Sequence, residues 1–277
     1  MKKTRRADEA LYNDLNLESI ELARALIMEG RALAGDRKLL RPGDPVRQGE
    51  VLRVKGRAVD AYVSRGAHKL KRALEAFEID LRGAVCVDVG ASTGGFTDVM
   101  LRAGAEHVYC VDVGYNLLDY RLRSDPRVTA LERTNARFLT AEHFPVAPEF
   151  GATDVSFISL KAVLPAVLPL LTGRREFVAL VKPQFEAAKE DVGEKGVVRD
   201  PQVHARVLRD ILEFIGATDW AAAGLTHSPV RGPEGNIEFL LHLLPREGAP
   251  SEVPADAVEG IISAAYDFFF KSSKCPL

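Results

Sequence analysis

Residues 84–97 read AVCVDVGASTGGFT, and this stretch decides the fold. An apolar run that ends at Asp88 predicts a buried strand, and the small residues from Gly90 to Gly95 predict a tight turn that opens a helix. Such a turn presents backbone amides and a helix N-terminus to a ligand. About twenty residues beyond Gly90, Asp112 ends the next apolar run, where a carboxylate can bond the hydroxyls of a ribose. Together the two features indicate a nucleoside cofactor.

The turn departs from two better-known nucleotide signatures. The second glycine of the dinucleotide fingerprint would fall at Ser92, and the chain has no Gly-Lys pair followed by Ser or Thr. S-adenosylmethionine fits what remains, because it carries an adenosine without a pyrophosphate. The residues expected to hold it are Asp88, Gly90, Ser92, Thr93, Gly94, Gly95, Phe96 and Asp112.

Outward from this turn, short apolar runs alternate mostly with segments of helical length. The expected strands are residues 84–89, 107–111, 128–131, 152–155 and 177–181. This alternation predicts an α/β fold with a parallel sheet flanked by helices. Only the Pro- and Gly-rich stretch HSPVRGPEG separates the runs 219–226 and 236–244, so these two should close the sheet as an antiparallel hairpin.

The beginning of the chain has a different pattern. Helical spacing of Ala, Leu and Ile predicts helices over 6–15 and 19–29, the second stopped by Gly30. Strand-like pieces follow near 31–33 and 51–54, with a turn at 41–44 between them, and 66–77 is again helical. We therefore expect a small α+β domain over residues 1–60 and a larger α/β domain over residues 61–277.

The formal net charge of −2 over 277 residues conceals an asymmetry. Residues 1–72 hold 17 Lys and Arg against 10 Asp and Glu, whereas residues 73–277 hold 20 against 29. A basic head on an acidic body suggests that the head binds a polyanion on which the body acts, although a solvated charged face explains the same count. The basic residues expected to contact RNA are Lys2, Lys3, Arg5, Arg6, Arg65, Lys71 and Arg72.

Ionisable residues fall at the ends of the predicted strands. In open α/β sheets the site lies outside the carboxyl ends of the parallel strands, where Asp88, Asp112, Asp154 and Lys182 occur. Glu238 begins its strand, but the beginning of an antiparallel strand lies at the same edge. Unpaired charges in apolar surroundings are unfavourable, so these groups form either a structural salt-bridge cluster or a functional site.

At these positions the chain resembles a known family. The motifs that carry the resemblance are SRGAHKL (64–70), DVGASTGGFTD (88–98), TDVSFISL (153–160), LVKPQFE (180–186) and GNIEFLL (235–241). With the head in front, they resemble the TlyA or haemolysin A family of bacterial rRNA ribose methyltransferases, in which an S4 RNA-binding domain precedes an FtsJ/RrmJ-like domain. Within the head, Ser19-Ile20 and Ala34-Gly35-Asp36 depart from the family pattern.

The resemblance implies a Rossmann-like class I sheet, S-adenosylmethionine as cofactor, and 2′-O-methylation of ribosomal RNA, with cytidine as the expected nucleotide. The family's Lys, Asp, Lys, Glu tetrad maps onto Lys69, Asp154, Lys182 and Glu238. A ribose hydroxyl is a poor nucleophile whose proton must be removed or polarised. The working hypothesis makes Lys182 the proton acceptor, oriented by Asp154 and Glu238, while Lys69 polarises the hydroxyl. Without the resemblance, Lys69 would fit a basic helix face.

Other features narrow the class of protein. The chain has no apolar run of ~18 residues, no apolar stretch behind its basic start, no CxxC pair and no HExxH motif, so we expect a cytoplasmic protein without a metal or membrane partner. Its partners would be ribosomal RNA or ribosomal subunits. A noncatalytic RNA-binding or ribosome-assembly factor would not need the tetrad, and a membrane-lytic haemolysin would need an insertion segment that the sequence does not show. The oligomeric state stays open.

Two segments keep alternative interpretations. Residues 183–200, rich in charge and glycine, follow Lys182 directly and either close over a substrate or are disordered. The run Phe268-Phe269-Phe270 in the last predicted helix is expected to pack on the core, with a partner site as the alternative.

Overall fold

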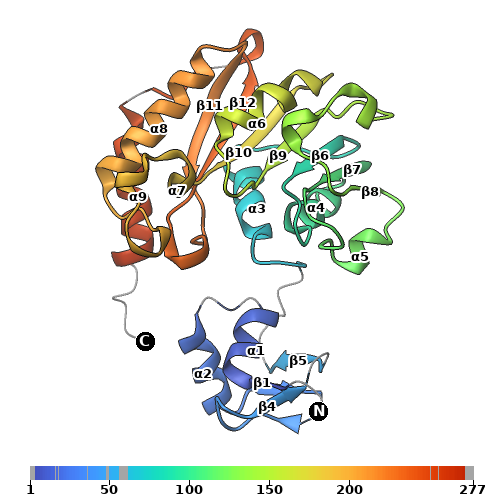
Figure 1. Ribbon diagram of the computed structural model, residues 1–277, viewed down its shortest axis with the longest axis vertical. Helices are drawn as coiled ribbons and strands as arrows, with labels where there is room; N and C mark the ends of the chain where they lie inside the picture. Colours follow the sequence, from blue (N-terminus) through green and yellow to red (C-terminus); the bar gives the residue numbers. More distant parts are fainter. Residues whose placement is uncertain are drawn as a thin grey trace. The chain divides into compact units, whose positions relative to one another are not determined.

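The computed structural model describes residues 4–15, 17, 19–35, 37–47, 50–55, 62–249, 251–254 and 256–271. The chain forms two compact units, Met1–Arg65 and Gly66–Leu277 (Figure 1). The division falls five residues after the domain boundary expected from the sequence. The larger unit carries every residue of the predicted tetrad.

The smaller unit combines two helices with short antiparallel strands. Its elements are β1 (Thr4–Arg6), α1 (Ala7–Asp14), α2 (Ile20–Met28), β2 (Ala32–Ala34), β3 (Arg37–Lys38), β4 (Pro45–Arg47) and β5 (Leu52–Val54). β1 pairs with β4, and β2 lies between β3 and β5. Both helices confirm the prediction. The sequence missed β1, β3 and β4, because strands of two or three mostly exposed residues leave no apolar pattern.

Local signals set the bounds of α2. The side chain of Ser19 accepts a hydrogen bond from the amide of Leu22 at 3.1 Å, which satisfies a free N–H of the first turn. Gly30 ends the helix with a φ of +66°, a conformation that glycine adopts without strain. The buried faces of α1 and α2 meet the strands in a separate small core that includes Leu11, Ile27 and Val46.

The larger unit is built on a seven-stranded sheet in the order β11-β12-β10-β9-β6-β7-β8. Its strands are β6 (Val85–Val89), β7 (His107–Val111), β8 (Val128–Leu131), β9 (Phe150–Thr153), β10 (Glu176–Val181), β11 (Trp220–His227) and β12 (Phe239–Pro245). The pairings from β10 to β8 are parallel, and β12 runs antiparallel to both β10 and β11. Both the parallel sheet and the closing hairpin are thereby confirmed.

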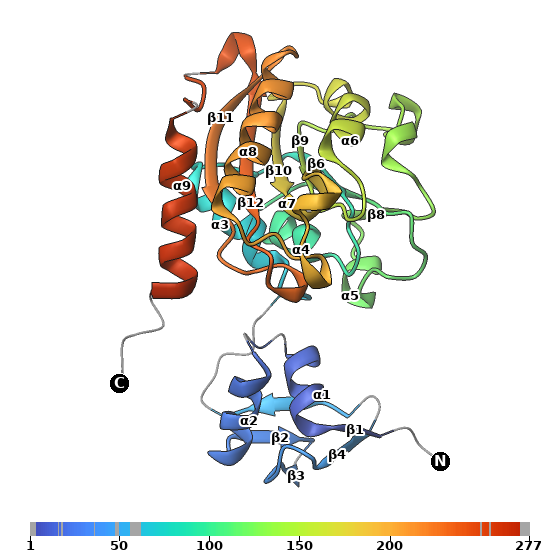
Figure 2. The ribbon, with the colours of Figure 1, turned by 60° about the vertical axis from the view of Figure 1, so that its left-hand side comes forward.

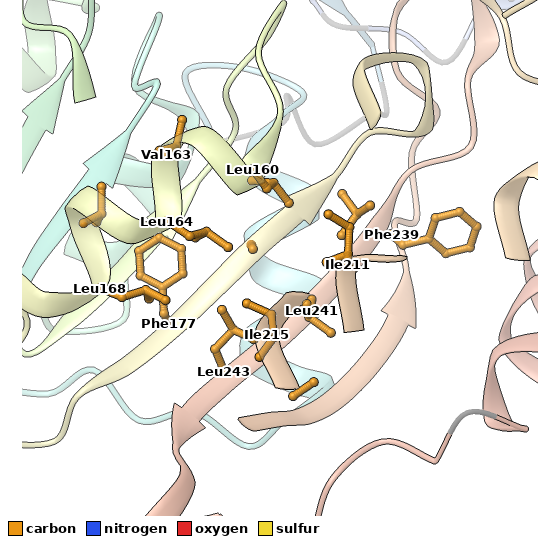
Figure 3. Packing of buried hydrophobic residues seen from close by; sticks show 14 of the residues in the cluster. Leu160, Val163, Leu164, Leu168, Phe177, Ile211, Ile215, Phe239, Leu241 and Leu243 are labelled. Carbon is orange, nitrogen blue, oxygen red and sulfur yellow. The ribbon is translucent and has the colours of Figure 1, made fainter. Parts of the chain in front are cut away.

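Helices cover both faces of the sheet, α6 and α8 on one side and α3 and α4 on the other (Figure 2). The helices are α3 (Ala67–Ala76), α4 (Gly95–Arg102), α5 (Tyr120–Arg123), α6 (Leu160–Val167), α7 (Pro183–Glu186), α8 (Pro201–Gly216) and α9 (Ala257–Tyr266). Side chains of α6 and α8 pack on Phe177 of β10 and Leu241 of β12 in the main core (Figure 3). Apolar burial on this scale is the main term that holds the sheet and helices together.

The structure bears on two segments for which the sequence left alternatives open. Residues 183–200 are ordered, with α7, two short 3₁₀ turns and the buried Val197 and Val198. The amide of Val198 donates to the side chain of Asn236 at 3.0 Å, which holds the segment in place. Of the three consecutive phenylalanines, Phe269 packs against the core, while Phe268 and Phe270 stay about half exposed.

Among the described residues, no helix combines the length and the hydropathy required to cross a bilayer.

Candidate active site

Four charged side chains from four separate segments meet in one cluster. The ammonium of Lys69 lies 3.1 Å from Asp154 Oδ2 and 2.8 Å from Glu238 Oε2. The ammonium of Lys182 lies 2.6 Å from Asp154 Oδ1. The side chains therefore form an alternating row of charges, Glu238, Lys69, Asp154 and Lys182. The sequence analysis expected Glu238 to orient Lys182, whereas its carboxylate pairs with Lys69.

Sheet topology explains the convergence of these residues. Asp154 directly follows β9 and Lys182 directly follows β10, so both lie at the carboxyl edge of the parallel sheet. Glu238 directly precedes β12, and the antiparallel direction of that strand returns its beginning to the same edge. Lys69 reaches the cluster from the first turns of α3.

Burial makes the charges interdependent. Burial alone would lower the pKa of Lys69, but the carboxylates of Asp154 and Glu238 outweigh it and raise that pKa above its ordinary value. Burial alone would also raise the pKa of Asp154, yet the two ammonium groups lower it. Lys69 and Asp154 are therefore held in their charged forms. Lys69 contacts two carboxylates, whereas Lys182 contacts one carboxylate and the hydroxyl of Ser156 at 2.9 Å.

Two glycines and a serine that sequence reasoning did not assign to the catalytic cluster shape it. A Cβ added to Gly232 would lie 2.2 Å from Glu238 Oε1, so the missing side chain makes room for this carboxylate. A Cβ added to Gly90, whose φ is +84°, would lie 2.9 Å from the carbonyl oxygen of Asp154. Ser156 stands in the quoted motif TDVSFISL, but no hydropathy pattern marks it as a partner of Lys182.

An aromatic side chain stands at the edge of the cluster. Phe157 is 91% exposed and has a φ of +63°, a strained backbone for a non-glycine residue. Its ring lies 5.0 Å from that of Phe185, and the ammonium of Lys182 lies 5.8 Å from the Phe185 ring. A strained, exposed phenylalanine beside a polar cluster offers a flat surface on which a planar ligand can stack.

The predicted cofactor loop joins β6 to α4. Gly94 caps the helix with a φ of +94°, Gly95 begins it, and Ser92 and Thr93 are exposed on the loop. The carboxylate of Asp112 accepts hydrogen bonds from the amide of Ser92 at 2.8 Å and from the amide of Gly114 at 2.7 Å. These bonds fix the carboxylate beside the loop, at the edge where the sequence analysis expected it.

Two members of the predicted cofactor set have buried side chains. Asp88 Oδ2 accepts hydrogen bonds from the amide of Thr97 at 2.9 Å and from its hydroxyl at 2.7 Å, which joins the end of β6 to α4. Burial raises the pKa of Asp88 to about 7, against these hydrogen bonds. Phe96 is also buried. The structure thus places both side chains inside the unit.

The predicted RNA-binding residues divide between the units. In the smaller unit Arg5 pairs with Asp14 and Arg6 with Asp8, each within 3.0 Å, and Arg65 ends that unit. Lys71 and Arg72 are exposed on α3 of the larger unit, where Lys71 lies 3.6 Å from Glu75. Lys2 and Lys3 lie outside the described residues.

The described part of the chain contains no group of three or more His, Cys, Asp or Glu side chains arranged to hold a metal ion.

Known proteins share this sequence and architecture. The family model described as FtsJ-like methyltransferase matches residues 62–244. The Bacillus subtilis protein YqxC is 44% identical over 267 residues, 95% of each chain. The 16S/23S rRNA (cytidine-2′-O)-methyltransferase TlyA of Mycobacterium tuberculosis is 44% identical over 88% of this chain and 91% of its own. A solved structure from Streptococcus thermophilus, which carries a hemolysin name, has a TM-score of 0.83 at 38% identity and covers 99% of this chain and 100% of its own.

Proposed function

The chain belongs to the FtsJ-like methyltransferase family, and on that premise we propose that it transfers a methyl group from S-adenosylmethionine to the 2′-hydroxyl of a cytidine in ribosomal RNA. The observation that carries the proposal is the row of paired charges at the carboxyl edge of the sheet, formed by the buried Glu238, Lys69 and Lys182 with the partly buried Asp154. A noncatalytic RNA-binding protein would not need a cluster of this kind. The relative from Mycobacterium tuberculosis supports the choice of cytidine and of ribosomal RNA.

The two lysines have different roles in the proposed reaction. Lys69, held between two carboxylates, stays an ammonium and can donate a hydrogen bond to the ribose hydroxyl. Lys182, which contacts one carboxylate and the hydroxyl of Ser156, is the candidate to accept the hydroxyl proton when its amine is neutral. Asp154 orients both ammonium groups, and Glu238 holds Lys69.

The loop after β6 has the features required to hold the cofactor. Its exposed Ser92 and Thr93, the opening of α4 at Gly95 and the carboxylate of Asp112 offer backbone donors to the methionine part and an acceptor to the ribose hydroxyls. When bound, S-adenosylmethionine supplies a methyl group activated by a positively charged sulfur. Gly90 packs against the backbone of Asp154, which brings the cofactor loop next to the catalytic cluster.

Features of both units support an RNA substrate. The exposed ring of Phe157 can stack on an unpaired base presented to the cluster. The smaller unit has the size, the α+β elements and the basic composition expected of an S4-like RNA-binding domain, and we assign it that role within the proposal. A ribosomal RNA substrate places the activity in the cytoplasm.

Mass-spectrometric mapping of ribose methylation tests the proposed function. Ribosomal RNA from a deletion strain should lack 2′-O-methylcytidine at one or more positions, and complementation with the intact gene should restore it. Complementation with a Lys182→Ala variant should not. Identical methylation maps in the deletion and parent strains would contradict the proposed substrate.

A further inference from the structure

Glu186 connects two loops that both carry residues of the proposed active site. Its Oε2 accepts a hydrogen bond from the hydroxyl of Ser159 at 2.6 Å, and its Oε1 accepts one from the amide of Leu160 at 2.7 Å. Ser159 and Leu160 mark the start of α6, directly after the loop with Asp154, Ser156 and Phe157. Glu186 is the last residue of α7, the short helix that begins directly after Lys182. The carboxylate therefore bridges the loops after β9 and β10.

These hydrogen bonds differ from ordinary helix capping. Asp119 precedes α5 and Asp200 precedes α8. Each caps its helix by accepting a hydrogen bond from the amide two residues further along the chain. At α6 that local role belongs to Ser159, whose hydroxyl accepts from the amide of Lys161. Glu186 adds a second acceptor from 26 residues further along the chain. Its carboxylate is favoured at a helix N-terminus, where free amides and the helix dipole both attract it.

The same two loops are also joined by other contacts near the proposed active site. Lys182 donates a hydrogen bond to Ser156, and the rings of Phe157 and Phe185 lie 5.0 Å apart. Because Phe157 has a strained backbone, contacts around it must hold it in that conformation. Burial raises the pKa of Glu186, despite hydrogen bonds from Ser159 and Leu160 that favour its charged form. A partly buried carboxylate that accepts two hydrogen bonds is held in a fixed position, unlike a charged side chain that is surrounded by solvent.

We propose that Glu186 is a positioning residue for methyl transfer: its carboxylate locks the loop 154–159 to the segment 182–186 and so sets how Lys182 and the ring of Phe157 face the substrate nucleotide. The inference rests on the proposed function and adds a residue outside the tetrad. Glu186 itself does not contact the reacting atoms. It acts through Ser159 and Leu160 on one loop and through α7 on the other.

Three variants of the full chain test the role. Glu186→Ala should lower kcat for ribosomal RNA methylation by about 10- to 100-fold, because an error of about 1 Å in the position of reacting groups has an effect of this size. Affinity for S-adenosylmethionine should stay within twofold. Glu186→Gln, which keeps an acceptor for Leu160 and a polar group for Ser159, should recover most of kcat. Glu190→Ala removes an exposed carboxylate four residues further along the chain and should match the wild type.

Hydrogen–deuterium exchange separates failure of this inference from failure of the proposed function. Exchange across residues 154–161 should be faster in Glu186→Ala than in Glu190→Ala, whether or not any RNA is methylated. An inactive wild type with this exchange difference would overturn the proposed function and support the lock. Equal exchange in the two variants, or unchanged kcat in Glu186→Ala beside an active wild type, would overturn the role of Glu186.

Discussion

At the scale of single residues, the two lysines of the site are unequal. Lys69 lies between Asp154 and Glu238, and its pKa is raised although the side chain is almost fully buried. Lys182 shares Asp154 and contacts the hydroxyl of Ser156 in place of a second carboxylate. In the proposed reaction this asymmetry gives the two lysines separate roles: Lys69 holds the hydroxyl as a cation, and Lys182 accepts its proton.

Gly232 gives a residue-scale prediction. In Gly232→Ala the new Cβ would lie 2.2 Å from Glu238 Oε1, so the carboxylate must move and its pairing with Lys69 must weaken. We expect single-turnover methylation to slow by about 10- to 100-fold, the effect of misplaced catalytic groups. Gly216→Ala, which places its Cβ where no atom lies within 4 Å, is the matched control and should react at the wild-type rate. Equal rates in both variants would show that the position of Glu238 does not matter.

Asp88 predicts a pH dependence of stability. Its pKa is about 7 in the folded chain and about 3.9 in the unfolded chain, so between these values the folded state binds more protons. The contribution of Asp88 to the free energy of unfolding is therefore greatest below about pH 4 and declines as the pH rises to about 7. Denaturant unfolding should show Asp88→Asn gaining stability relative to the wild type between pH 5 and pH 7. Parallel curves for the two proteins would contradict the shift.

The sequence predicted the site residues at strand ends and missed those that act across loops. Asp154, Lys182 and Glu238 lie next to apolar runs, and a charged residue beside an apolar run can be recognised from the sequence alone. Gly232 and Glu186 matter through contacts with residues 6 and 26 positions away, which depend on how two loops pack. No local pattern shows such contacts, so only coordinates reveal them.

At the scale of elements, the reversed strand β12 completes the site. Because β12 runs antiparallel to β10, Glu238 at its beginning lies at the same edge of the sheet as Asp154 and Lys182, which follow the ends of β9 and β10. The hairpin signal HSPVRGPEG made this reversal predictable. The insertion of β12 between β10 and β11 was not predictable, since strand order depends on which faces pack together. β9 covers Phe150–Thr153 and so lies two residues before the expected range 152–155.

The loop between β6 and α4 gives the prediction at this scale. Asp112→Ala removes the acceptor for the amides of Ser92 and Gly114 and the expected acceptor for the cofactor ribose. Hydrogen bonds to a charged acceptor contribute about 1.5 to 3 kcal/mol each, so S-adenosylmethionine should bind at least about tenfold more weakly by calorimetry. Asp125→Ala, in the turn before β8, should leave the affinity unchanged. Wild-type protein that binds a nicotinamide dinucleotide and not S-adenosylmethionine would overturn the cofactor assignment.

At the scale of the whole molecule, two units have separate cores and opposite charge. The smaller core includes Leu11 and Ile27, and the larger is built on the seven-stranded sheet. Hydropathy and turn residues led us to expect two domains, because the two parts of the sequence have different periodicities. The exact boundary was not predictable, since residues around 60 carry no strong turn or helix signal.

A truncation tests the assignment of RNA binding to the smaller unit. Without residues 1–60 the protein should bind ribosomal RNA more weakly, and log affinity should fall less steeply with log salt, because fewer phosphate counterions are released. Binding of S-adenosylmethionine should survive, since the cofactor loop lies in the larger unit. Filter binding at several salt concentrations gives both quantities. An unchanged salt slope would place the RNA contacts on the larger unit.

The most direct test of the central claim, that Lys182 accepts the proton of a ribose hydroxyl, is the single-turnover methylation rate of Lys182 variants as a function of pH. Lys182→Ala should lower the rate by about 10²- to 10⁴-fold and leave S-adenosylmethionine affinity nearly unchanged. Lys182→Arg should fail as well, because a guanidinium does not lose its proton at accessible pH. The wild-type rate should rise with pH while chemistry limits it. A fast Lys182→Arg enzyme with a flat pH profile would contradict the claim and leave Lys182 only a positioning role.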